Sequence, residues 1–415
     1  MKTYEYKKSK ELFAKAAKII PSGIYGHLGP SEGCFIPVDA FPYYMEKAKG
    51  PYFWDIDGNK FIDYMCAYGP NVLGYNDDRV DEAAMEQLKL GNCTVLPSTK
   101  MVELAELLTD TVESADWAFF AKNGGDVTNL AVLTARAATG RNKIVKVDGG
   151  YHGVAQWMQA LGYPGITEAD ISNVISIPFN DTEAFEKVIA ENRGDIACFI
   201  STPYDHPAMA DSALPKEGYW SKMREICDRE GILLIIDDVR CGFRLDTKGS
   251  DYHYGFKADL ICFCKALANG YNISALCGRG EFKSAVSSVF YTGSYWLSAV
   301  PMAAAVRTIG ILRDENAAKY MLETGKKITE GLKEAASKHG YELVVTGETS
   351  MWFMRLANDP SSMRHQRFVS ECVRRGVFFT NHHNQFMNTS IGDKEIEFTL
   401  EVADEAFGVM EKEGV

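Results

Sequence analysis

Residues 231–279 read GILLIIDDVRCGFRLDTKGSDYHYGFKADLICFCKALANGYNISALCGR and contain three short apolar runs. The first run, 232–236, lies between a glycine and two carboxylates, Asp237 and Asp238. Five apolar residues bounded in this way predict a strand buried on both faces, as in a parallel sheet. Because ligands of open α/β sheets bind at the carboxyl ends of the strands, we expect these carboxylates to face a crevice.

The second apolar run, 259–264, ends on a cation, Lys265, and the third, 273–278, predicts a further strand after a turn. A buried Asp237 and a buried Lys265 at neighbouring strand ends suit pyridoxal phosphate chemistry. There the lysine forms a Schiff base with the aldehyde, and the aspartate keeps the pyridine nitrogen protonated. An ion pair on a sheet edge is the alternative interpretation, and for either residue alone it is the simpler one.

The composition indicates a soluble globular protein of two or more domains, with 415 residues, 46% apolar and 24% charged. A net charge of −12 argues against nucleic acid as a partner, since phosphate binding needs clustered Lys and Arg. No apolar run has the length of a membrane helix, and the charged N-terminus lacks a signal-peptide pattern. Ten cysteines without a C-x-x-C pair favour buried free thiols in a reducing cytoplasm over disulfides or a metal site.

Strand and helix signals alternate through the middle of the chain, which predicts a doubly wound, mostly parallel sheet. Beyond the runs given above, the expected strands are 117–121, 143–147 and 196–200, with helices between them. A hairpin is expected earlier, at 51–64, around the turn signal Asp57-Gly58. We expect an N-terminal segment with part of a small domain (1–74), a large domain (75–300) and a C-terminal α+β small domain (301–415).

Two turns at strand ends are candidates for binding a flat, phosphorylated ligand. Asn123-Gly124-Gly125 joins a predicted strand to a helix, where backbone N–H groups and the positive helix end favour a phosphate. Tyr151-His152 ends the next strand and offers an aromatic ring. Alone, the first is most often a simple turn and the second a partly buried aromatic pair. A dinucleotide-dependent oxidoreductase is disfavoured, because the G-x-G-x-x-G fingerprint is absent.

Taken together, these motifs resemble the class III aminotransferases of pyridoxal phosphate fold type I, from about residue 20 to the C-terminus. The glutamate-1-semialdehyde aminomutase branch is the most similar. The resemblance implies a seven-stranded large-domain sheet and a pyridoxal 5'-phosphate cofactor. It implies phosphate binding by Asn123, Gly124 and Gly125. It also implies ring stacking within the Tyr151-His152-Gly153 motif, a pyridine-nitrogen contact from Asp237, packing of Val239 on the opposite ring face, and the Schiff base on Lys265.

The chain departs from the family pattern where the partner subunit and the substrate are bound. Trp296 stands in place of the family's phosphate-binding threonine, so Thr292 or Ser294 is the candidate hydroxyl. The aminomutase's substrate arginine is replaced around 27–30, and its C-terminal glutamate is replaced within 380–386. We take Arg240 and His383 as candidate substrate contacts, and Tyr68, in a stretch that matches the family, as a wall of the substrate pocket.

These departures favour an aminotransferase that moves an amino group between an amine or amino acid and a keto acid or aldehyde. An aminomutase of the glutamate-1-semialdehyde type and an amino-acid racemase are the alternatives within the same chemistry. A catalytically silent cofactor-binding protein is a third, against which the intact Asp237–Lys265 pair argues. The resemblance further implies a homodimer or larger assembly, with the segment 291–301 crossing to the partner.

Overall fold

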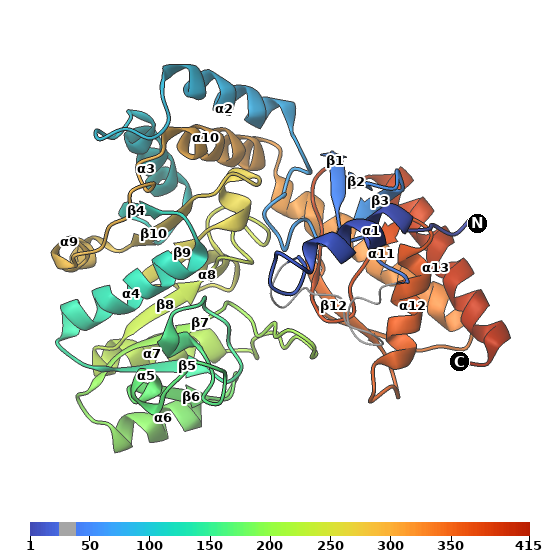
Figure 1. Ribbon diagram of the computed structural model, residues 1–415. Helices are drawn as coiled ribbons and strands as arrows, with labels where there is room; N and C mark the ends of the chain where they lie inside the picture. Colours follow the sequence, from blue (N-terminus) through green and yellow to red (C-terminus); the bar gives the residue numbers. More distant parts are fainter. Residues whose placement is uncertain (25–38) are drawn as a thin grey trace. The chain divides into compact units, whose positions relative to one another are not determined.

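The computed structural model describes residues 1–24 and 39–415, and the chain divides into two compact units. The large unit comprises residues 78–207 and 213–319, and the small unit comprises 1–77, 208–212 and 320–415. The expected domain limits lie after residues 74 and 300. The large unit extends to residue 319 because α10 (Ala299–Asp314) packs on α2 (Asp78–Leu90) and α3 (Lys100–Thr111), as Figure 1 shows.

A seven-stranded sheet forms the centre of the large unit, in the order β4-β10-β9-β8-β7-β5-β6. Its strands are β4 (Trp117–Ala121), β5 (Lys143–Val147), β6 (Val174–Ile177), β7 (Ile196–Ser201), β8 (Leu233–Asp237), β9 (Leu260–Phe263) and β10 (Ser274–Gly278). Every neighbouring pair is parallel except the two that β10 makes, with β4 and β9. The predicted mostly parallel, doubly wound sheet is confirmed.

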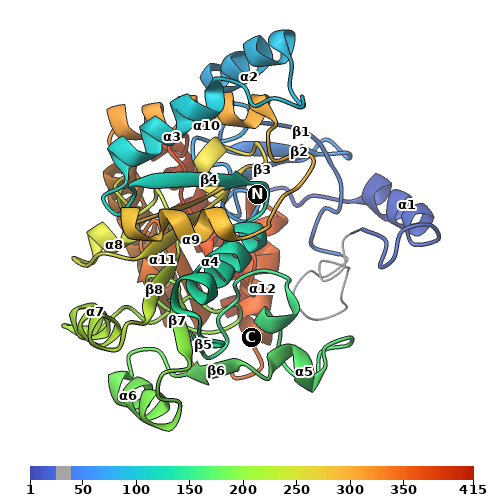
Figure 2. The ribbon, with the colours of Figure 1, turned by 90° about the vertical axis from the view of Figure 1, so that its left-hand side faces the viewer.

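Burial on both faces explains the apolar strands. All five residues of β8 are buried, as expected of a central parallel strand. Helix α4 (Gly124–Thr139) packs on β7, β9 and β10, with α9 (Lys283–Ser288) beside it (Figure 2). The other helices of the unit are α5 (Glu168–Ile171), α6 (Thr182–Glu191), α7 (Tyr219–Glu230) and α8 (Ser250–His253).

The small unit contains two antiparallel-rich sheets and its own helices (Figure 1). One sheet has the order β1-β2-β3-β13 and the other β11-β12-β14. The strands are β1 (Met45–Lys49), β2 (Tyr52–Asp55), β3 (Lys60–Asp63), β11 (Leu343–Glu348), β12 (Met351–Leu356), β13 (Val377–Phe378) and β14 (Gln385–Phe386). The helices are α1 (Lys7–Ala16), α11 (Ala317–Lys338), α12 (Met363–Val373) and α13 (Asp393–Glu413).

The hairpin predicted from Asp57-Gly58 is confirmed. Strands β2 and β3 pair antiparallel, and Gly58 has φ of 87°, a left-handed conformation that glycine adopts without steric strain. Strand β13 then pairs in parallel with β3, aligning Val377 with Ile62. Through this pairing the C-terminal part of the chain completes a sheet that the N-terminal part begins. No helix among the described residues is long and apolar enough to cross a membrane.

Asp259, which precedes β9, ties three elements of the large unit together. Its buried carboxylate accepts the Leu234 N–H of β8 at 2.7 Å. It also accepts hydrogen bonds from Arg224 of α7 at 2.9 Å and from Arg279, after β10, at 2.8 Å. This carboxylate therefore fixes β8 and β9 side by side, which are the two strands that end at the candidate active site.

We expect Asp259→Ala to lower the free energy of unfolding by about 3–5 kcal/mol. The change leaves the partly buried Arg224 guanidinium and the Leu234 N–H without the carboxylate that they bind. Asp228→Ala is the matched control, because Asp228 pairs with the same Arg224 from an exposed position. That change should cost less than about 1 kcal/mol. Urea unfolding followed by circular dichroism measures both. Equal losses in the two variants would contradict this role of Asp259.

Candidate active site

Three strands of the large unit end on the same edge of the sheet. Strands β8 and β9 are parallel, and β4 runs with them because β10 is antiparallel to both β4 and β9. Asp237 is the last residue of β8, and Lys265 follows β9 after one intervening residue. The turn at Asn123 follows β4. The predicted aspartate, lysine and glycine-rich turn therefore all follow the carboxyl ends of these strands.

Asp237 is held in place by a histidine that follows a different strand. His152 is 2% exposed, and its Nδ1 lies 2.8 Å from Asp237 Oδ2. Since a carboxylate only accepts, Nδ1 is the donor. The His152 carbonyl in turn accepts a hydrogen bond from the Thr128 hydroxyl of α4 at 2.6 Å. The Val239 N–H donates to Asp237 Oδ1 at 3.1 Å. Both carboxylate oxygens are thus oriented by the protein.

Asp238, the second carboxylate after the strand, has a structural role. It accepts hydrogen bonds from the Ser250 hydroxyl at 2.5 Å and from the Ser250 N–H at 3.0 Å. Burial raises the pKa of Asp238 to about 7. Neighbouring side chains of β-structure point to opposite faces, which explains why adjacent aspartates meet different partners.

The turn before α4 is built to start a helix. The Asp126 carboxylate accepts the Asn123 N–H at 2.8 Å and the Lys122 N–H at 3.2 Å, so the helix begins at Gly124 with its N-terminal donors organised. Helix α4 has 16 residues, and the end that follows β4 is its positive end. This is suitable geometry for an anion such as a phosphate.

Gly124 of α4 and Gly153 of the loop after β5 allow close approaches that a side chain would prevent. A Cβ on Gly124 would lie 2.8 Å from Val239 Cγ1, so the start of α4 and the residues after β8 touch. A Cβ on Gly153 would lie 2.6 Å from the Gly125 Cα. Gly153 also has φ of 121°, which L side chains rarely adopt. The loop that carries Tyr151 and His152 is thereby held against the helix start.

Lys265 occupies a strained position and has an altered basicity. Its φ is 45°, in the left-handed region that costs a non-glycine residue about 1–2 kcal/mol. Burial, reinforced by the nearby positive charge of Arg240, lowers the pKa of Lys265 from 10.5 to about 7. At neutral pH a large fraction of Lys265 is therefore the neutral amine, the form that reacts with carbonyl compounds.

Arg240 contacts a second histidine, His206. One guanidinium nitrogen, Nη1, donates to the His206 carbonyl at 3.0 Å and lies 3.0 Å from His206 Nδ1. Burial lowers the pKa of Arg240. Sequence reasoning singled out Arg240 but missed His206, because a lone histidine on a loop carries no pattern. Its only signal is a position shortly after the carboxyl end of β7.

The remaining predicted residues differ in their surroundings. Tyr151 is 62% exposed, on the loop after β5. Thr292 and Ser294 are exposed between α9 and α10. Trp296, which replaces the family threonine, packs on Tyr291 with ring centroids 5.1 Å apart.

Tyr68 and His383 belong to the small unit and lie together there. Their rings meet edge to face with centroids 5.0 Å apart, and His383 Nδ1 lies 3.0 Å from the Asn384 carbonyl oxygen. The expected replacement of the substrate arginine, at 27–30, lies outside the described residues. In 1–24 and 39–415, no group of three or more His, Cys, Asp or Glu side chains is arranged to hold a metal ion.

The residues at the strand ends fit a flat, phosphorylated pyridine. The helix start offers a phosphate site, and the glycines leave backbone exposed at close range. An oriented carboxylate, Asp237, and a largely neutral amine, Lys265, stand on adjacent strands. A ligand that fits these groups carries a phosphate for the helix start, a ring nitrogen for the carboxylate and an aldehyde for the amine. The fold and site thus define a fold type I pyridoxal phosphate enzyme.

The chain belongs to the class III aminotransferase family, whose model matches residues 36–402. It is an enzyme of that family and uses pyridoxal phosphate. A solved structure of the FumI protein of Sphingopyxis sp. MTA144, in its PLP internal aldimine form, matches with a TM-score of 0.94 and 38% identity. The match covers 98% of this chain and 97% of that one.

Two curated relatives show the range of activities in the family. The aminopentol aminotransferase of Sphingopyxis macrogoltabida is 38% identical over 97% of this chain and 94% of its own length. The glutamate-1-semialdehyde 2,1-aminomutase of Methanocaldococcus jannaschii is 33% identical over 97% of this chain and 99% of its own. The expected family is therefore confirmed, with aminotransferases and aminomutases both among the relatives.

We expect Gly153→Ala to weaken pyridoxal phosphate binding about tenfold or more, because its Cβ meets the Gly125 backbone and forces the loop away from α4. Gly149→Ala is the matched control on the same loop. Gly149 has φ of 69° with nothing within 4 Å of the added Cβ, so it carries the backbone penalty alone. Cofactor titration of the apoprotein by fluorescence quenching measures both. Equal affinities in the two variants would contradict the close-approach role of Gly153.

Proposed function

We propose that Lys265 holds pyridoxal phosphate covalently and that Asp237 pairs with its pyridine nitrogen. On this basis the protein moves an amino group from an amine or amino acid to a keto acid or aldehyde. The observation that carries the proposal is that Lys265, with a pKa of about 7, follows the strand next to the one that ends on Asp237, whose carboxylate is fixed by His152. In the alternative interpretation, a simple ion pair, the carboxylate would stabilise the charged lysine, so the lysine pKa would not be lowered.

Each residue has a task that follows from its surroundings. When bound, the cofactor supplies an electron sink for the electrons of a bond at the substrate carbon that bears nitrogen. Lys265 Nζ, neutral near pH 7, would take the proton from that carbon and deliver it to the cofactor's aldehyde carbon, since return to the same substrate carbon would only racemise the substrate. Asp237 holds positive charge on the ring nitrogen, and His152 keeps its carboxylate aligned. Asn123, Gly124 and Gly125 bind the phosphate at the start of α4, while Tyr151 and Val239 bind the two ring faces.

Substrate recognition involves residues outside the shared cofactor motifs. We assign Arg240 to an acid group of the amino acid or keto acid, since a guanidinium binds carboxylates through paired hydrogen bonds. Tyr68 and His383 are assigned as further substrate contacts. The name of the aminopentol aminotransferase relative supports an amine as donor. The aminomutase relatives support internal transfer of the amino group as the second candidate.

We further propose a cytoplasmic homodimer in which Thr292 or Ser294 completes the partner's phosphate site. The segment between α9 and α10 supports this assembly, because Phe290 is 94% and Tyr295 69% exposed. Large exposed aromatics are typical of interfaces. The cysteines of the described residues are all free thiols, most of them buried, which suits a reducing compartment.

The apoprotein should capture pyridoxal phosphate at a rate that rises with pH through about 7 and levels off within about one unit above, as Lys265 loses its proton. Borohydride reduction and peptide mass mapping should find the pyridoxyl group on Lys265. Lys265→Ala should abolish the adduct, whereas Lys122→Ala, a buried lysine after β4, should keep it. An adduct on another lysine, or capture still rising towards pH 10.5, would refute the assignment.

A panel of amines and amino acids, offered with and without pyruvate or 2-oxoglutarate, tests the reaction. We expect a new amino acid only when an acceptor is present. Arg240→Met should raise KM for the keto acid about 10- to 100-fold, the loss of a charge-assisted pair, with less effect on an amine donor without an acid group. Turnover of one substrate to its isomer without acceptor would instead establish the aminomutase or racemase reaction.

A further inference from the structure

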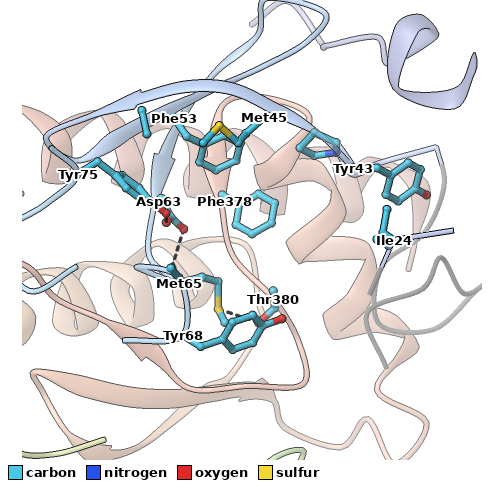
Figure 3. A pocket seen from close by; sticks show the side chains of 13 residues that line it. Ile24, Tyr43, Met45, Phe53, Asp63, Met65, Tyr68, Tyr75, Phe378 and Thr380 are labelled. Atoms are coloured by element: carbon cyan, nitrogen blue, oxygen red, sulfur yellow. Dashed lines mark hydrogen bonds between the residues drawn. The ribbon is translucent and has the colours of Figure 1, made fainter. Parts of the chain in front are cut away.

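Two features of the chain are not explained by cofactor binding. One is a hollow in the small unit, whose wall combines apolar side chains such as Met45 with the hydrogen-bonded Asp63 and Tyr75 (Figure 3). Because its wall mixes apolar and polar groups, the hollow selects no single ligand chemistry. The other feature is His206 of the large unit, which contacts Arg240 through two acceptor atoms. This second feature has a definite chemical consequence.

His206 and Arg240 follow neighbouring strands of the large sheet. Strands β7 and β8 are adjacent and parallel, and His206 comes shortly after the end of β7 while Arg240 comes shortly after the end of β8. Both residues therefore lie at the sheet edge to which Asp237 belongs. Burial, and next the nearby positive charge of Arg240, lowers the pKa of Lys265. Arg240 is thus close to the reactive amine within the large unit.

The contact between the two residues fixes the direction of the guanidinium. Arg240 Nη1 lies 3.0 Å from the His206 carbonyl oxygen and 3.0 Å from His206 Nδ1. A guanidinium only donates, so Nδ1 must accept with its lone pair and carries no proton. Nη1 has two N–H groups, and these two acceptors take both. A bidentate carboxylate contact by Arg240 is therefore made through Nε and Nη2, and His206 sets the direction of that edge.

His206 is itself held firmly by the loop that follows β7. Its side chain is 7% exposed, and its ring meets the fully buried Tyr204 edge to face with centroids 5.1 Å apart. The Tyr204 carbonyl accepts a hydrogen bond from the Thr202 hydroxyl at 2.8 Å. The backbones of Asp205 and Ala213 exchange hydrogen bonds of 3.0 and 2.8 Å. His206 is therefore a fixed support for Arg240, in the way that well-ordered sites hold their contact residues.

We propose that His206 is a positioning residue, which holds the Arg240 guanidinium in the orientation that receives the acid group of a keto acid or amino acid. The inference rests on the proposed role of Arg240 in amino-group transfer and adds the residue that orients it. Arginine has a long side chain, and ordering it only when the acid binds would weaken binding about tenfold or more. His206 removes this cost because it orders Arg240 before the substrate arrives.

His206→Leu and His206→Asn form a matched pair, because the two new side chains have nearly the same shape and only asparagine offers an acceptor close to the position of Nδ1. With the holoenzyme and a saturating amine, we expect His206→Leu to raise KM for pyruvate about tenfold with kcat within about twofold, and His206→Asn to stay within about threefold of the wild type. Equal KM values in the two variants would overturn the inference. If leucine prevents folding, His206→Gln, whose amide lies one carbon farther out, takes its place.

An acceptor without an acid group separates the orientation of Arg240 from general damage to the site. Neither variant should change KM for propanal by more than about twofold, since propanal has no carboxylate for the guanidinium. In an Arg240→Met background, His206→Leu should raise KM for pyruvate no further, because both changes remove one contact. His253→Leu is the control, since His253 is exposed on α8 and its ring also meets a tyrosine, Tyr254, edge to face. An equal rise for propanal, or an additive rise with Arg240→Met, would overturn the inference.

A binding measurement separates this inference from the reaction. Calorimetric titration of the holoenzyme with propionate, an unreactive carboxylate, should show about tenfold weaker binding in His206→Leu and nearly unchanged binding in His206→Asn. That pattern in a protein that transfers no amino group would support the orientation of Arg240 and refute the aminotransferase function. Normal transfer with equal propionate affinities in the wild type and both variants would refute the role of His206 alone. A wild type that binds no propionate would overturn the acid contact of Arg240 and this inference together.

Discussion

The arrangement of the active site depends on keeping a carboxylate and an amine at the buried ends of adjacent strands without letting them form a simple ion pair. His152 Nδ1 lies 2.8 Å from Asp237 and so gives the carboxylate a hydrogen-bond partner other than Lys265. Burial and the Arg240 charge keep Lys265 largely neutral. If the two groups paired directly, the lysine would stay charged and lose its nucleophilicity. The parallel sheet makes this possible because it aligns strand ends that are distant in sequence.

The close contacts around the helix start serve the same arrangement. Gly124 lets Val239 touch α4, and Gly153 lets the loop of His152 touch Gly125. The Thr128 hydroxyl then holds the His152 carbonyl from within α4. The segments after β4, β5 and β8 are therefore packed into one unit, so a shift in any one of them moves Asp237. Catalytic groups need this support, because small displacements of reacting groups reduce rates strongly.

The sequence predicted what local patterns encode. The run 232–236 and its terminal aspartates gave β8, and Asp57-Gly58 gave the hairpin, because burial and turn chemistry act over a few residues. The pairing of His152 with Asp237 joins residues 85 positions apart, and no pattern in either segment indicates it. Strand β13 has only two residues and exists as a strand because β3 pairs with it. Such features depend on the finished fold, so a single sequence does not reveal them.

The sequence departs from the aminomutase pattern mainly where we propose that the substrate binds. The cofactor residues keep the charges and glycines that the chemistry requires, so variation there would cost activity with any substrate. Tyr68 and His383 of the small unit carry no such restriction, and their rings meet edge to face. Because the cofactor chemistry is common to aminotransferases and aminomutases, the proposed substrate contacts are where we expect the difference in reaction to arise.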